Sequence, residues 1–512
     1  MERSPVKAPV GLDPNALLDP EVYPHKVDRL QLLETHISWV VLTGDWAYKL
    51  KKPVDFGFLD YSSLERRRSF CYEELRLNGR LAPDIYVEVV TLNAQDGKIC
   101  FEGSGEVLEY AVKMRQFPQE GLYDRQLSEG RLCAEQMDRL GRMVAHFHQG
   151  AARAEEASAF GQPQDVQAPC LDNFLTLWKL EPEHRSSLQT LLHWTELEFE
   201  RLSSFLEIRK RSGFVRELHG DLHLGNVAEV NGQPLLFDGI EFDPELRWVD
   251  TLNDLAFLVS DLEHRGRPDL GRVALDAYLE ETGDYQGLRL WDYYVIYRWM
   301  VRAKVVALRK AQGHPEVAQE ISLYLQQALV RTQPRTPRLV VTHGLSGSGK
   351  TFYSQWLLQQ EDIIRLRSDV VRKGLHGLSP DQHSGSGLGQ GIYSQDQSQQ
   401  TYQVLREKAA QLLRAGQSVV VDATCLKRTQ RDSFRQLAQE LGVPFQLVAL
   451  DAPVAVLQER IARRQTQTSD ASEADLAVLA HQIHTQDPLA ADETDVQFPP
   501  PISVVFSGDR LQ

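Results

Sequence analysis

The chain has few cysteines for its length and no long hydrophobic run. Its five cysteines stand far apart among 512 residues, in none of the close pairs that zinc sites or compact disulfide frameworks need. No stretch approaches the roughly 20 apolar residues of a membrane-spanning helix, and the first residues lack the apolar core of a signal peptide. We therefore expect reduced thiols, no membrane partner and a cytoplasmic location.

Positive charge is also in short supply. Lys and Arg number 56 against 71 Asp and Glu, a formal net charge of -15. Because nucleic-acid backbones are held mainly by Lys and Arg, this balance argues against a general nucleic-acid-binding protein and leaves room only for a local basic groove, such as one holding a 5′-hydroxyl end. The content of 42% hydrophobic and 25% charged residues is that of an ordinary globular protein.

A short segment with two prolines, RTQPRTP at residues 331–337, separates two different sequence patterns. Residues 22–330 begin with strand-like stretches and continue with mostly helical ones, which predicts an α+β domain of two lobes. Residues 338–512 alternate short apolar strands with helical segments, which predicts an α/β domain with a parallel sheet. The expected strands are RLVVTHG, IIRLRSD, SVVVDAT, FQLVALDA and ISVVFSG.

One stretch of the second pattern is rich in Gly, Ser and Gln. It covers residues 376–400, HGLSPDQHSGSGLGQGIYSQDQSQQ. This composition predicts a mobile loop or lid rather than part of the core.

The first chemical motif is HGDLHLGN at residues 219–226, followed by a short strand pattern that ends at Asp238. Transfer of a phosphoryl group needs a carboxylate to orient the attacking hydroxyl and accept its proton, and oxygen ligands that hold magnesium on the nucleotide. Asp221, Asn226 and Asp238 supply these residue types. The alternative is that each is an ordinary turn or helix-capping residue.

This motif resembles the catalytic loop of aminoglycoside phosphotransferases and choline-kinase-like enzymes, in which HGD is followed by a histidine and an asparagine. The resemblance implies a protein-kinase-like domain over residues 22–330. It also implies that Asp221 is the catalytic base and that Asn226 and Asp238 bind Mg²⁺. No clear glycine-rich cover precedes the strand WAYKLKK, which weakens any assignment as a protein kinase.

The same resemblance implies that Lys49, in WAYKLKK, and Glu74, in CYEELRLNGRL, form the ion pair that places the ATP phosphates. Lys51 and Glu73 are nearby alternatives, and a solvated lysine is the plainer interpretation. The two histidines of HGDLHLGN are interpreted either as metal ligands or as hydrogen-bonded loop residues, and no third ligand pattern supports the metal.

The second motif, GLSGSGKT, matches the P-loop pattern G-x-x-x-x-G-K-[ST] and lies between a predicted strand and a predicted helix. Its glycines allow successive main-chain N–H groups to face phosphate oxygens at a helix N-terminus. Lys350 is expected to reach the β- and γ-phosphates and Thr351 to bind magnesium. The predicted nucleotide-binding residues are Gly344, Ser346, Gly347, Ser348, Gly349, Lys350 and Thr351.

Companion residues suggest the reaction at this second motif. Asp369 follows the second strand and is expected to accept the acceptor's hydroxyl proton, while Asp422 ends the third strand at a position suited to Mg²⁺. Arg460 and Arg464, with Arg463, share one face of a predicted helix and would stabilise the transferred phosphoryl group. Structural ion pairs, caps and a solvated helix face are the alternatives for these residues.

The order of these motifs resembles the polynucleotide-kinase, gluconate-kinase and zeta-toxin group of P-loop kinases. The whole arrangement resembles bacterial fusion proteins described as bifunctional aminoglycoside phosphotransferase and ATP-binding protein. The resulting hypothesis is an enzyme with two ATP- and Mg²⁺-dependent sites, each phosphorylating a hydroxyl of a small-molecule or nucleotide-like acceptor. Three alternatives stay open: a P-loop domain that acts as a regulatory ATP switch, a binding module whose kinase half is degenerate, and a protein kinase. The fold permits the last, although no recognisable activation segment follows Asp238.

Overall fold

The computed structural model of the chain describes residues 12–57, 59–95, 97–386, 390–465, 471–493 and 496–497. The chain forms two compact units, each built from several stretches of sequence. Unit 1 comprises Met1–Leu132, Gly150–Leu171 and Ser203–Asp261. Unit 2 comprises Cys133–Gln149, Asp172–Leu202 and Leu262–Gln512.

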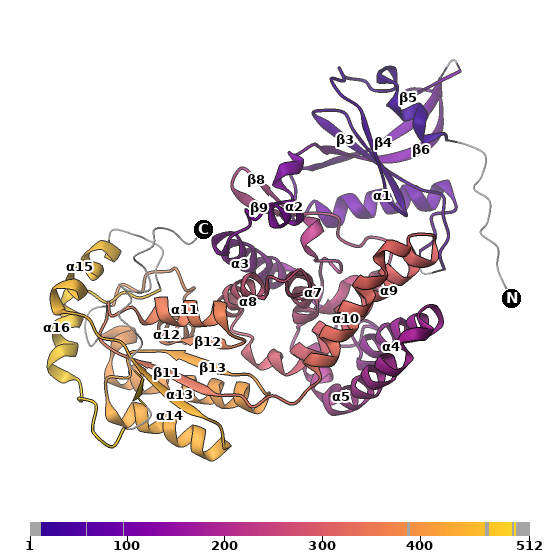
Figure 1. Cartoon of the computed structure of the whole chain (residues 1–512). Coiled ribbons are helices and arrows are strands. Elements are labelled where there is room, and N and C mark those ends of the chain that lie inside the picture. The colour runs from indigo at the N-terminus through magenta and orange to yellow at the C-terminus, as the bar shows by residue number, and fades with distance from the viewer. Residues whose placement is uncertain are drawn as a thin grey trace. The chain divides into compact units, whose positions relative to one another are not determined.

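Unit 1 contains a six-stranded antiparallel sheet of order β1-β2-β3-β6-β4-β5 (Figure 1). Its strands are β1 (Gln31–Glu34), β2 (Ser38–Leu42), β3 (Trp46–Lys51), β4 (Tyr86–Gln95), β5 (Lys98–Phe101) and β6 (Glu106–Arg115). Helix α1 (Leu64–Asn78) lies along one face, and its first turn is capped by Ser63, whose Oγ accepts a hydrogen bond from Arg66 N–H. Because Tyr48 and Leu50 of β3 are fully buried, this strand is held firmly in the core.

The elements that surround the first motif also belong to unit 1. They are α2 (Tyr123–Ser128), β7 (Val215–Glu217), β8 (Val227–Val230), β9 (Gln233–Leu236), α6 (Pro244–Arg247), β10 (Trp248–Asp250) and most of α7 (Thr251–His264). The motif HGDLHLGN therefore connects β7 to β8, and Asp238 lies just after β9.

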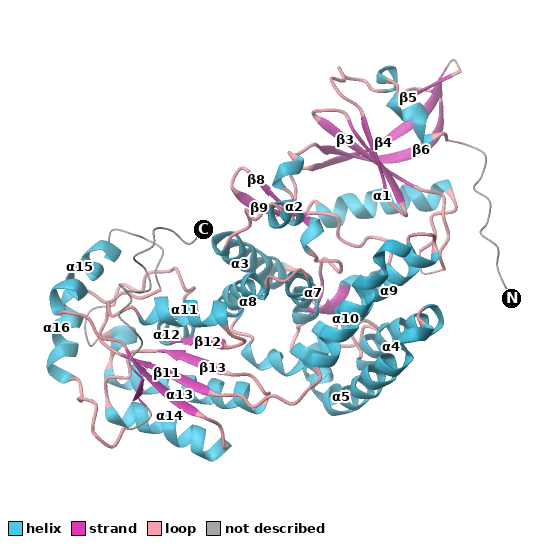
Figure 2. Cartoon of the chain, viewed as in Figure 1, coloured by secondary structure: helices cyan, strands magenta, loops and turns pink. Residues whose placement is uncertain are grey.

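The other helices before the P-loop are α3 (Ala134–Gly150), α4 (Pro163–Leu180), α5 (Arg185–Arg211), α8 (Pro268–Thr282), α9 (Trp291–Ala311) and α10 (Ala318–Arg331) (Figure 2). Helices α8 and α9 bury most of their side chains. None of the helices within the described ranges is long and apolar enough to cross a membrane.

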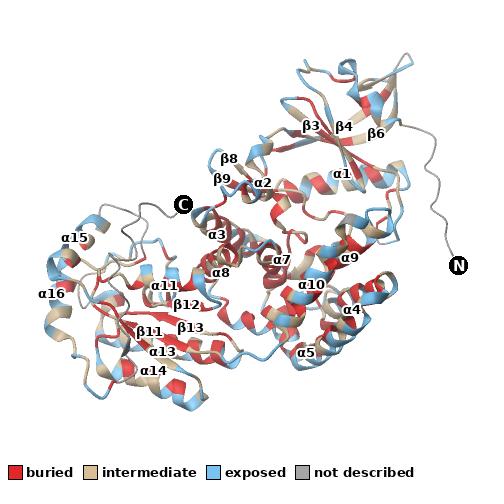
Figure 3. Ribbon diagram, viewed as in Figure 1, coloured by how far each residue is buried: buried red, intermediate tan, exposed pale blue. Residues whose placement is uncertain are grey.

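The second sheet lies in unit 2 and consists entirely of parallel strands, in the order β12-β13-β11-β14-β15. These are β11 (Leu339–His343), β12 (Ile364–Arg367), β13 (Val419–Asp422), β14 (Phe445–Ala449) and β15 (Val496–Gln497). Strand β13 is buried throughout and β11 is buried up to Thr342, as continuous apolar runs in a covered parallel sheet should be (Figure 3). Four of the predicted strands are confirmed, and the fifth, ISVVFSG at residues 502–508, lies outside the described residues.

Helices cover both faces of this parallel sheet. They are α11 (Lys350–Gln360), α12 (Ser368–Gly374), α13 (Gln395–Arg414), α14 (Arg428–Leu441), α15 (Val454–Gln465) and α16 (Leu476–Thr485). Helix α11 lies on one side of the sheet and α14 on the other (Figure 1). Because all the strands point the same way, the loops after β11, β12 and β13 meet at one edge, where ligands bind in open α/β folds.

The prediction of a loop over residues 376–400 was wrong for its last part. Helix α13 begins at Gln395, with Ser394 as its N-cap and a hydrogen bond of 3.4 Å from Gln397 N–H to Ser394 Oγ. Residues 395–400 contain no Gly or Pro, and Gln is a good helix former, so the cap is sufficient to start the helix here.

A fully buried arginine fixes the loop after β13. Arg431 of α14 donates from Nε and Nη2 to Glu493 Oε1 and Oε2, at 2.7 and 2.9 Å. Its Nη1 donates to the main-chain oxygens of Cys425 and Leu426, at 3.2 and 3.3 Å. Because these carbonyls follow Asp422 closely, the arginine holds the end of the central strand in place.

We expect Arg431→Met to destabilise unit 2 strongly. Removing the guanidinium leaves the buried Glu493 carboxylate with the more distant Arg435, 3.6 Å away, as its ion-pair partner, and breaking such a buried pair costs about 3–5 kcal/mol. The matched control is Arg428→Met on the same helix, because the Arg428 side chain is 43% exposed and its ion pairs with Asp432 and Asp492 face solvent, where such pairs contribute at most about 1 kcal/mol. Urea unfolding followed by tryptophan fluorescence compares the two variants, and equal losses would contradict the role given to Arg431.

Candidate active sites

The loop of the first motif is held by carboxylates from α7. Asp254 accepts hydrogen bonds from the main-chain N–H groups of His219 and Gly220, at 3.2 and 2.8 Å. Two turns further along α7, Asp261 accepts a hydrogen bond from Leu224 N–H at 3.0 Å. Both acids lie on one helix face seven residues apart, so a rigid element fixes the loop at two points.

Gly220 is required by this arrangement. Its φ of +82° belongs to the left-handed region, and a Cβ at this position would stand 2.7 Å from Leu246 O. The close approach of the two main chains therefore excludes any larger residue before Asp221.

Asp221 and Asn226 lie together at the end of this loop. Asn226 Nδ2 donates to Asp221 O and Oδ2, at 3.0 and 3.3 Å. The Asp221 side chain is 37% exposed, so a solvent-borne hydroxyl can reach its carboxylate. Since Asn226 donates through its amide nitrogen, its Oδ1 stays available as an oxygen ligand.

The two histidines of the motif make hydrogen bonds within the loop. Buried His219 contacts Phe237 O through Nε2 at 2.9 Å and accepts from Asp221 N–H through Nδ1 at 3.3 Å. Burial lowers the pKa of His219, which favours the neutral ring. His223 accepts from Gly225 N–H at 3.1 Å. Their placement agrees with hydrogen-bonded loop histidines.

Lys49 lies between two carboxylates. Its Nζ is 2.7 Å from Glu74 Oε1 on α1 and also contacts Asp238. Burial acts to lower the pKa of Lys49, but the charges of Asp238 and Glu74 outweigh it and hold the pKa well above its usual value. Asp238 has a φ of +63° and a side chain that is 46% exposed, so the main chain turns its carboxylate towards solvent and the lysine together.

Lys51 and Glu73, the alternative pair, have different partners. Lys51 Nζ lies 2.8 Å from Glu74 Oε2 and also contacts Glu241, so Glu74 is shared by two lysines. Burial raises the pKa of Glu74, but Lys49 and Lys51 overcome this and lower it to about 2. Glu73 instead pairs with Arg76 and Arg247, at 2.8 Å in each case. Sequence reasoning missed Glu241, although it lies in the FDGIEF segment next to Asp238.

Asp221, Asn226 and Asp238 thus offer carboxylate and amide oxygens, which are the ligands that Mg²⁺ prefers in proteins. Lys49 adds a positive charge beside them. The residues of the first motif therefore fit a magnesium-bound triphosphate.

The P-loop depends on glycine conformations. Gly344, Gly347 and Gly349 have φ values of +149°, +83° and +99°. A Cβ on Gly344 would stand 2.3 Å from Leu450 O. The loop therefore passes too close to the main chain at the end of β14 for any side chain to fit. Since α11 begins at Lys350, its first N–H groups have no acceptor within the helix and are available to an anion.

Lys350 lies at the base of the loop. Its Nζ donates to Leu345 O at 2.8 Å. Burial lowers its pKa to about 8, and Asp422 and Asp369 offset only part of that effect. A triphosphate placed here would supply the negative charge that the lysine needs.

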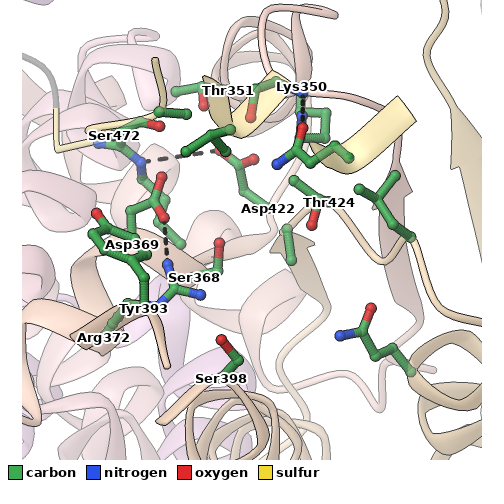
Figure 4. A pocket seen from close by; sticks show the side chains of 18 of the residues that line it. Lys350, Thr351, Ser368, Asp369, Arg372, Tyr393, Ser398, Asp422, Thr424 and Ser472 are labelled. Atoms are coloured by element: carbon green, nitrogen blue, oxygen red, sulfur yellow. Dashed lines mark hydrogen bonds and ion pairs between the residues drawn. The ribbon is translucent and has the colours of Figure 1, made fainter. Parts of the chain in front are cut away.

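Of the two acids predicted for this site, Asp422 ends one strand and Asp369 follows the neighbouring strand (Figure 4). Asp422, the last residue of β13, is 5% exposed and accepts from Ser354 Oγ of α11 at 3.0 Å. Asp369 lies in the first turn of α12, because β12 ends two residues earlier at Arg367, and its Oδ1 is 2.8 Å from Arg372 Nη1. Figure 4 shows both side chains, with Thr351, around one pocket.

The predicted arginines reach the same pocket. Arg460 Nη1 donates to Gly347 O at 3.1 Å, and Arg464 Nη2 donates to Ala474 O at 2.7 Å. Arg463 lies beside them on α15, so all three line the cavity. Arg460 thereby links α15 directly to the P-loop.

A cavity of about 1860 Å³ joins these residues. Its lining includes Lys350, Thr351, Asp369, Asp422, Arg460 and Arg464. Small-molecule sites usually have about 300–1,000 Å³, so there is space for a nucleotide and a second molecule. Ser348, also predicted to bind nucleotide, has a buried Oγ without a hydrogen-bond partner in the described chain.

Two further residues of this site gave no sequence signal. Gln482 of α16 accepts a hydrogen bond from Ser346 N–H at 2.9 Å. Arg367 lies with its Nε 4.0 Å from Asp422 Oδ2 and its Nη1 3.3 Å from Glu280 Oε1. These three contacts join residues more than 50 positions apart, so the sequence did not reveal them, although Arg367 itself belongs to the predicted strand segment IIRLRSD.

The lowered pKa of Lys350 predicts that nucleotide binding takes up protons. Near pH 8 the free site is about half protonated, and a bound triphosphate raises the pKa, so about half a proton should be taken up. Uptake should vanish near pH 6, and affinity should fall as the pH rises above 8. Calorimetry of Mg²⁺–ATP binding in buffers of different ionisation enthalpy measures this uptake. The chain used carries Asp238→Asn, which removes a predicted Mg²⁺ ligand of the first motif.

The control for this experiment is Lys350→Arg, which keeps a positive charge that does not titrate in this range. It should abolish the uptake attributed to Lys350. Equal proton uptake in both chains would contradict the assignment.

One comparison with known protein families agrees with a P-loop domain at the second site. The family model described as an AAA domain matches residues 339–489. Among solved structures, a choline/ethanolamine kinase family protein from Mesorhizobium loti is 12% identical, with 60% of this chain and 88% of that chain covered and a TM-score of 0.34. A gluconokinase from Sinorhizobium meliloti 1021 is 22% identical, with 33% and 89% covered and a TM-score of 0.24.

Similarity over nearly the whole chain is found in mycobacteria. Uncharacterized protein Rv2004c of Mycobacterium tuberculosis (strain ATCC 25618 / H37Rv) is 31% identical over 453 residues, which are 88% of this chain and 89% of that protein. Uncharacterized protein Mb2027c of Mycobacterium bovis matches with the same values. With this identity over most of both chains, the protein belongs to the same family as Rv2004c and Mb2027c.

Proposed function

We propose that the chain is a phosphotransferase with two ATP-dependent sites, each of which moves the γ-phosphoryl group of ATP to a hydroxyl of an acceptor. The observation that carries this proposal is the single cavity shared by the P-loop, Asp369 and Asp422. A site that only bound nucleotide would need no carboxylate on the far side of the phosphates. Asp369 lies in the first turn of a helix that borders the cavity, which supports assigning it this role.

At the P-loop site, the acceptor's hydroxyl oxygen attacks the γ-phosphorus, the bond to the β-phosphate oxygen breaks, and ADP leaves. Asp369 accepts the hydroxyl proton, while Lys350 and Arg460 offset the negative charge of the transferred group. Mg²⁺ held by Thr351 and Asp422 would further neutralise the phosphates. Arg464 supports the loop segment around Ala474, which lines the same cavity.

At the site in unit 1, Asp221 would accept the acceptor's proton, and Asn226 and Asp238 would hold magnesium on the nucleotide. Lys49, which is kept in place by Glu74, would contact the phosphates. The finer resemblance, to fusions of an aminoglycoside phosphotransferase with an ATP-binding protein, is consistent with this proposal. A division of the chain at residues 331–337, with one phosphotransferase site on each side, is also consistent with this proposal.

A second function is favoured by one contact. Arg367 lies between Asp422 of the nucleotide cavity and Glu280 of α8. A change in metal or nucleotide at Asp422 would therefore act on a helix outside the P-loop region. This path suits a regulatory ATP switch, in which the P-loop domain binds or hydrolyses ATP without an acceptor of its own.

The two functions differ in their need for Asp369. We expect Asp369→Asn to reduce acceptor phosphorylation at the P-loop site by about 10²–10⁴-fold, because the general base is lost, and to leave ATP affinity nearly unchanged. The matched control is Asp396→Asn, an exposed acid in the first turn of α13 outside the cavity lining. Acceptor-dependent ADP release and calorimetric ATP binding measure the two effects.

Asp221→Asn and Lys350→Ala assign each acceptor to a site, because each variant should silence only the acceptor of its own site. Unchanged transfer in Asp369→Asn would favour the switch over the transferase at the P-loop. Unchanged transfer in both Asp221→Asn and Lys350→Ala would reject the two-site proposal.

A further inference from the structure

The cavity beside the P-loop has two electrically different ends. At the phosphate end, Lys350 and Arg460 donate to main-chain oxygens of Leu345 and Gly347, which carry no formal charge. Their positive charges are therefore available to the phosphates of a nucleotide. The other end is lined by α13 and by the first turns of α14, and its charges are arranged differently.

Three basic side chains line this second end, and each is paired with a carboxylate. Arg372 lies 2.8 Å from Asp369. Arg406 lies 2.7 Å from Glu440, and Lys427 lies 3.2 Å from Asp487. Because each pair already cancels its own charge, this end offers little attraction to an additional carboxylate or phosphate on the acceptor.

The surface between these pairs consists of amides and hydroxyls. Gln395, Ser398, Gln399, Tyr402 and Gln403 line the cavity from α13. At spacings of three and four residues they share one face of the helix, and the stripe that runs through Ser398 and Tyr402 continues in the later turns as the buried Leu405, Ala409 and Leu412. The helix therefore turns a continuous polar stripe towards the cavity, and Figure 4 shows Ser398 at this end, away from Lys350.

Several of these groups have unused hydrogen-bonding capacity. Over the described ranges of the chain, no hydrogen bond is made by the side chains of Gln395, Ser398 or Gln399. Each Gln provides two donors and an acceptor, and each Ser a donor and an acceptor. An uncharged ligand with many hydroxyls matches such a surface, because each hydroxyl also both donates and accepts.

The aromatic rings at this end of the cavity offer little free surface on which a flat base could stack. The ring of Tyr393 is already covered by the guanidinium of Arg372, at 4.9 Å from its centroid. The hydroxyl of Tyr402 accepts from Cys425 N–H at 3.1 Å and lies 3.3 Å from Thr424 Oγ1, which fixes that side chain in the wall. Phe434 is 1% exposed. Hydrogen bonding therefore dominates over stacking.

We propose that the acceptor at the P-loop site is an uncharged compound with several hydroxyl groups, of the sugar or polyol class, bound along the Gln395–Gln403 face of α13. This inference rests on the proposed phosphotransferase function. One acceptor hydroxyl lies against Asp369 for transfer, and the others bond to Ser398 and Gln399. The anionic derivatives of the same compounds gain nothing from the paired arginines and lose solvation of their charge.

The test uses matched pairs of acceptors in a chain whose first site is silenced by Asp221→Asn. Each pair joins an uncharged compound with its anionic derivative: D-glucitol with D-gluconate, D-glucose with D-glucose 6-phosphate, and a neutral cyclitol with its monophosphate. Acceptor-dependent ADP formation that also requires Lys350 identifies the substrates. We expect kcat/KM for the uncharged member to be at least about tenfold higher, the effect of about 1.4 kcal/mol.

Two neighbouring glutamines provide the matched variants. Gln399 lines the cavity and Gln400 does not, although both are exposed on the same helix. Gln399→Ala and Ser398→Ala should each raise the acceptor KM about threefold to tenfold, the effect of one lost neutral hydrogen bond, with the KM for ATP unchanged. Gln400→Ala should change neither. Gln399→Arg should shift the preference towards the anionic member.

Preference for the anionic members, or equal effects of Gln399→Ala and Gln400→Ala on the acceptor KM, would overturn the inference while leaving phosphotransfer intact. A different result separates the failure of the underlying function. If no compound stimulates ADP formation and Asp369→Asn leaves ATP hydrolysis unchanged, phosphotransfer at the P-loop is itself rejected, and the acceptor class is rejected with it.

Discussion

The nucleotide cavity of unit 2 depends on the close approach of two main chains. The P-loop leaves β11 at Gly344, where a Cβ would stand 2.3 Å from Leu450 O, and Gly344 N–H donates to Thr424 O at 3.1 Å on the other side. The loop is thus fixed between the ends of β14 and β13. This confinement forces the positive φ values that turn its N–H groups towards one point, and it brings Asp422 beside Lys350.

The two candidate sites balance the charge of their buried lysines in opposite ways. In unit 1, Lys49 already lies between Glu74 and Asp238, so its charge is balanced before any ligand arrives. A magnesium ion that bound Asp238 would compete with Lys49 for the same carboxylate, and the lysine would then turn to the phosphates. In unit 2, the hydrogen-bond acceptor of Lys350 within the described residues is the carbonyl of Leu345, and its pKa is lowered to about 8, so a bound nucleotide would complete the charge balance.

Sequence reasoning succeeded where the chemistry is local. The P-loop pattern and the strand runs predicted the parallel sheet, since apolar periodicity and glycine spacing are encoded within a few residues. It failed for partners that only the fold brings together: Glu241 beside Lys51, Gln482 at Ser346, and Arg367 beside Asp422. It also missed the start of α13, because a Gln-rich composition suits a loop and a helix alike until the N-cap serine is recognised. The division at residues 331–337 stays a prediction.

The position of Arg367 bears on how the P-loop site can change its charge. If a metal bound at Asp422, it would displace the guanidinium that lies 4.0 Å away, and this largely shielded arginine would need another carboxylate. Glu280 provides it at 3.3 Å; burial acts to raise its pKa, but Arg367, Arg365 and Arg142 lower it to about 2, so it stays ionised. The acid on α8 therefore lets Asp422 exchange partners without leaving an unpaired charge in the interior. Such an exchange would carry a change at Asp422 to α8, as a regulatory switch requires, whereas a transferase at this site requires the acceptor-side role proposed for Asp369.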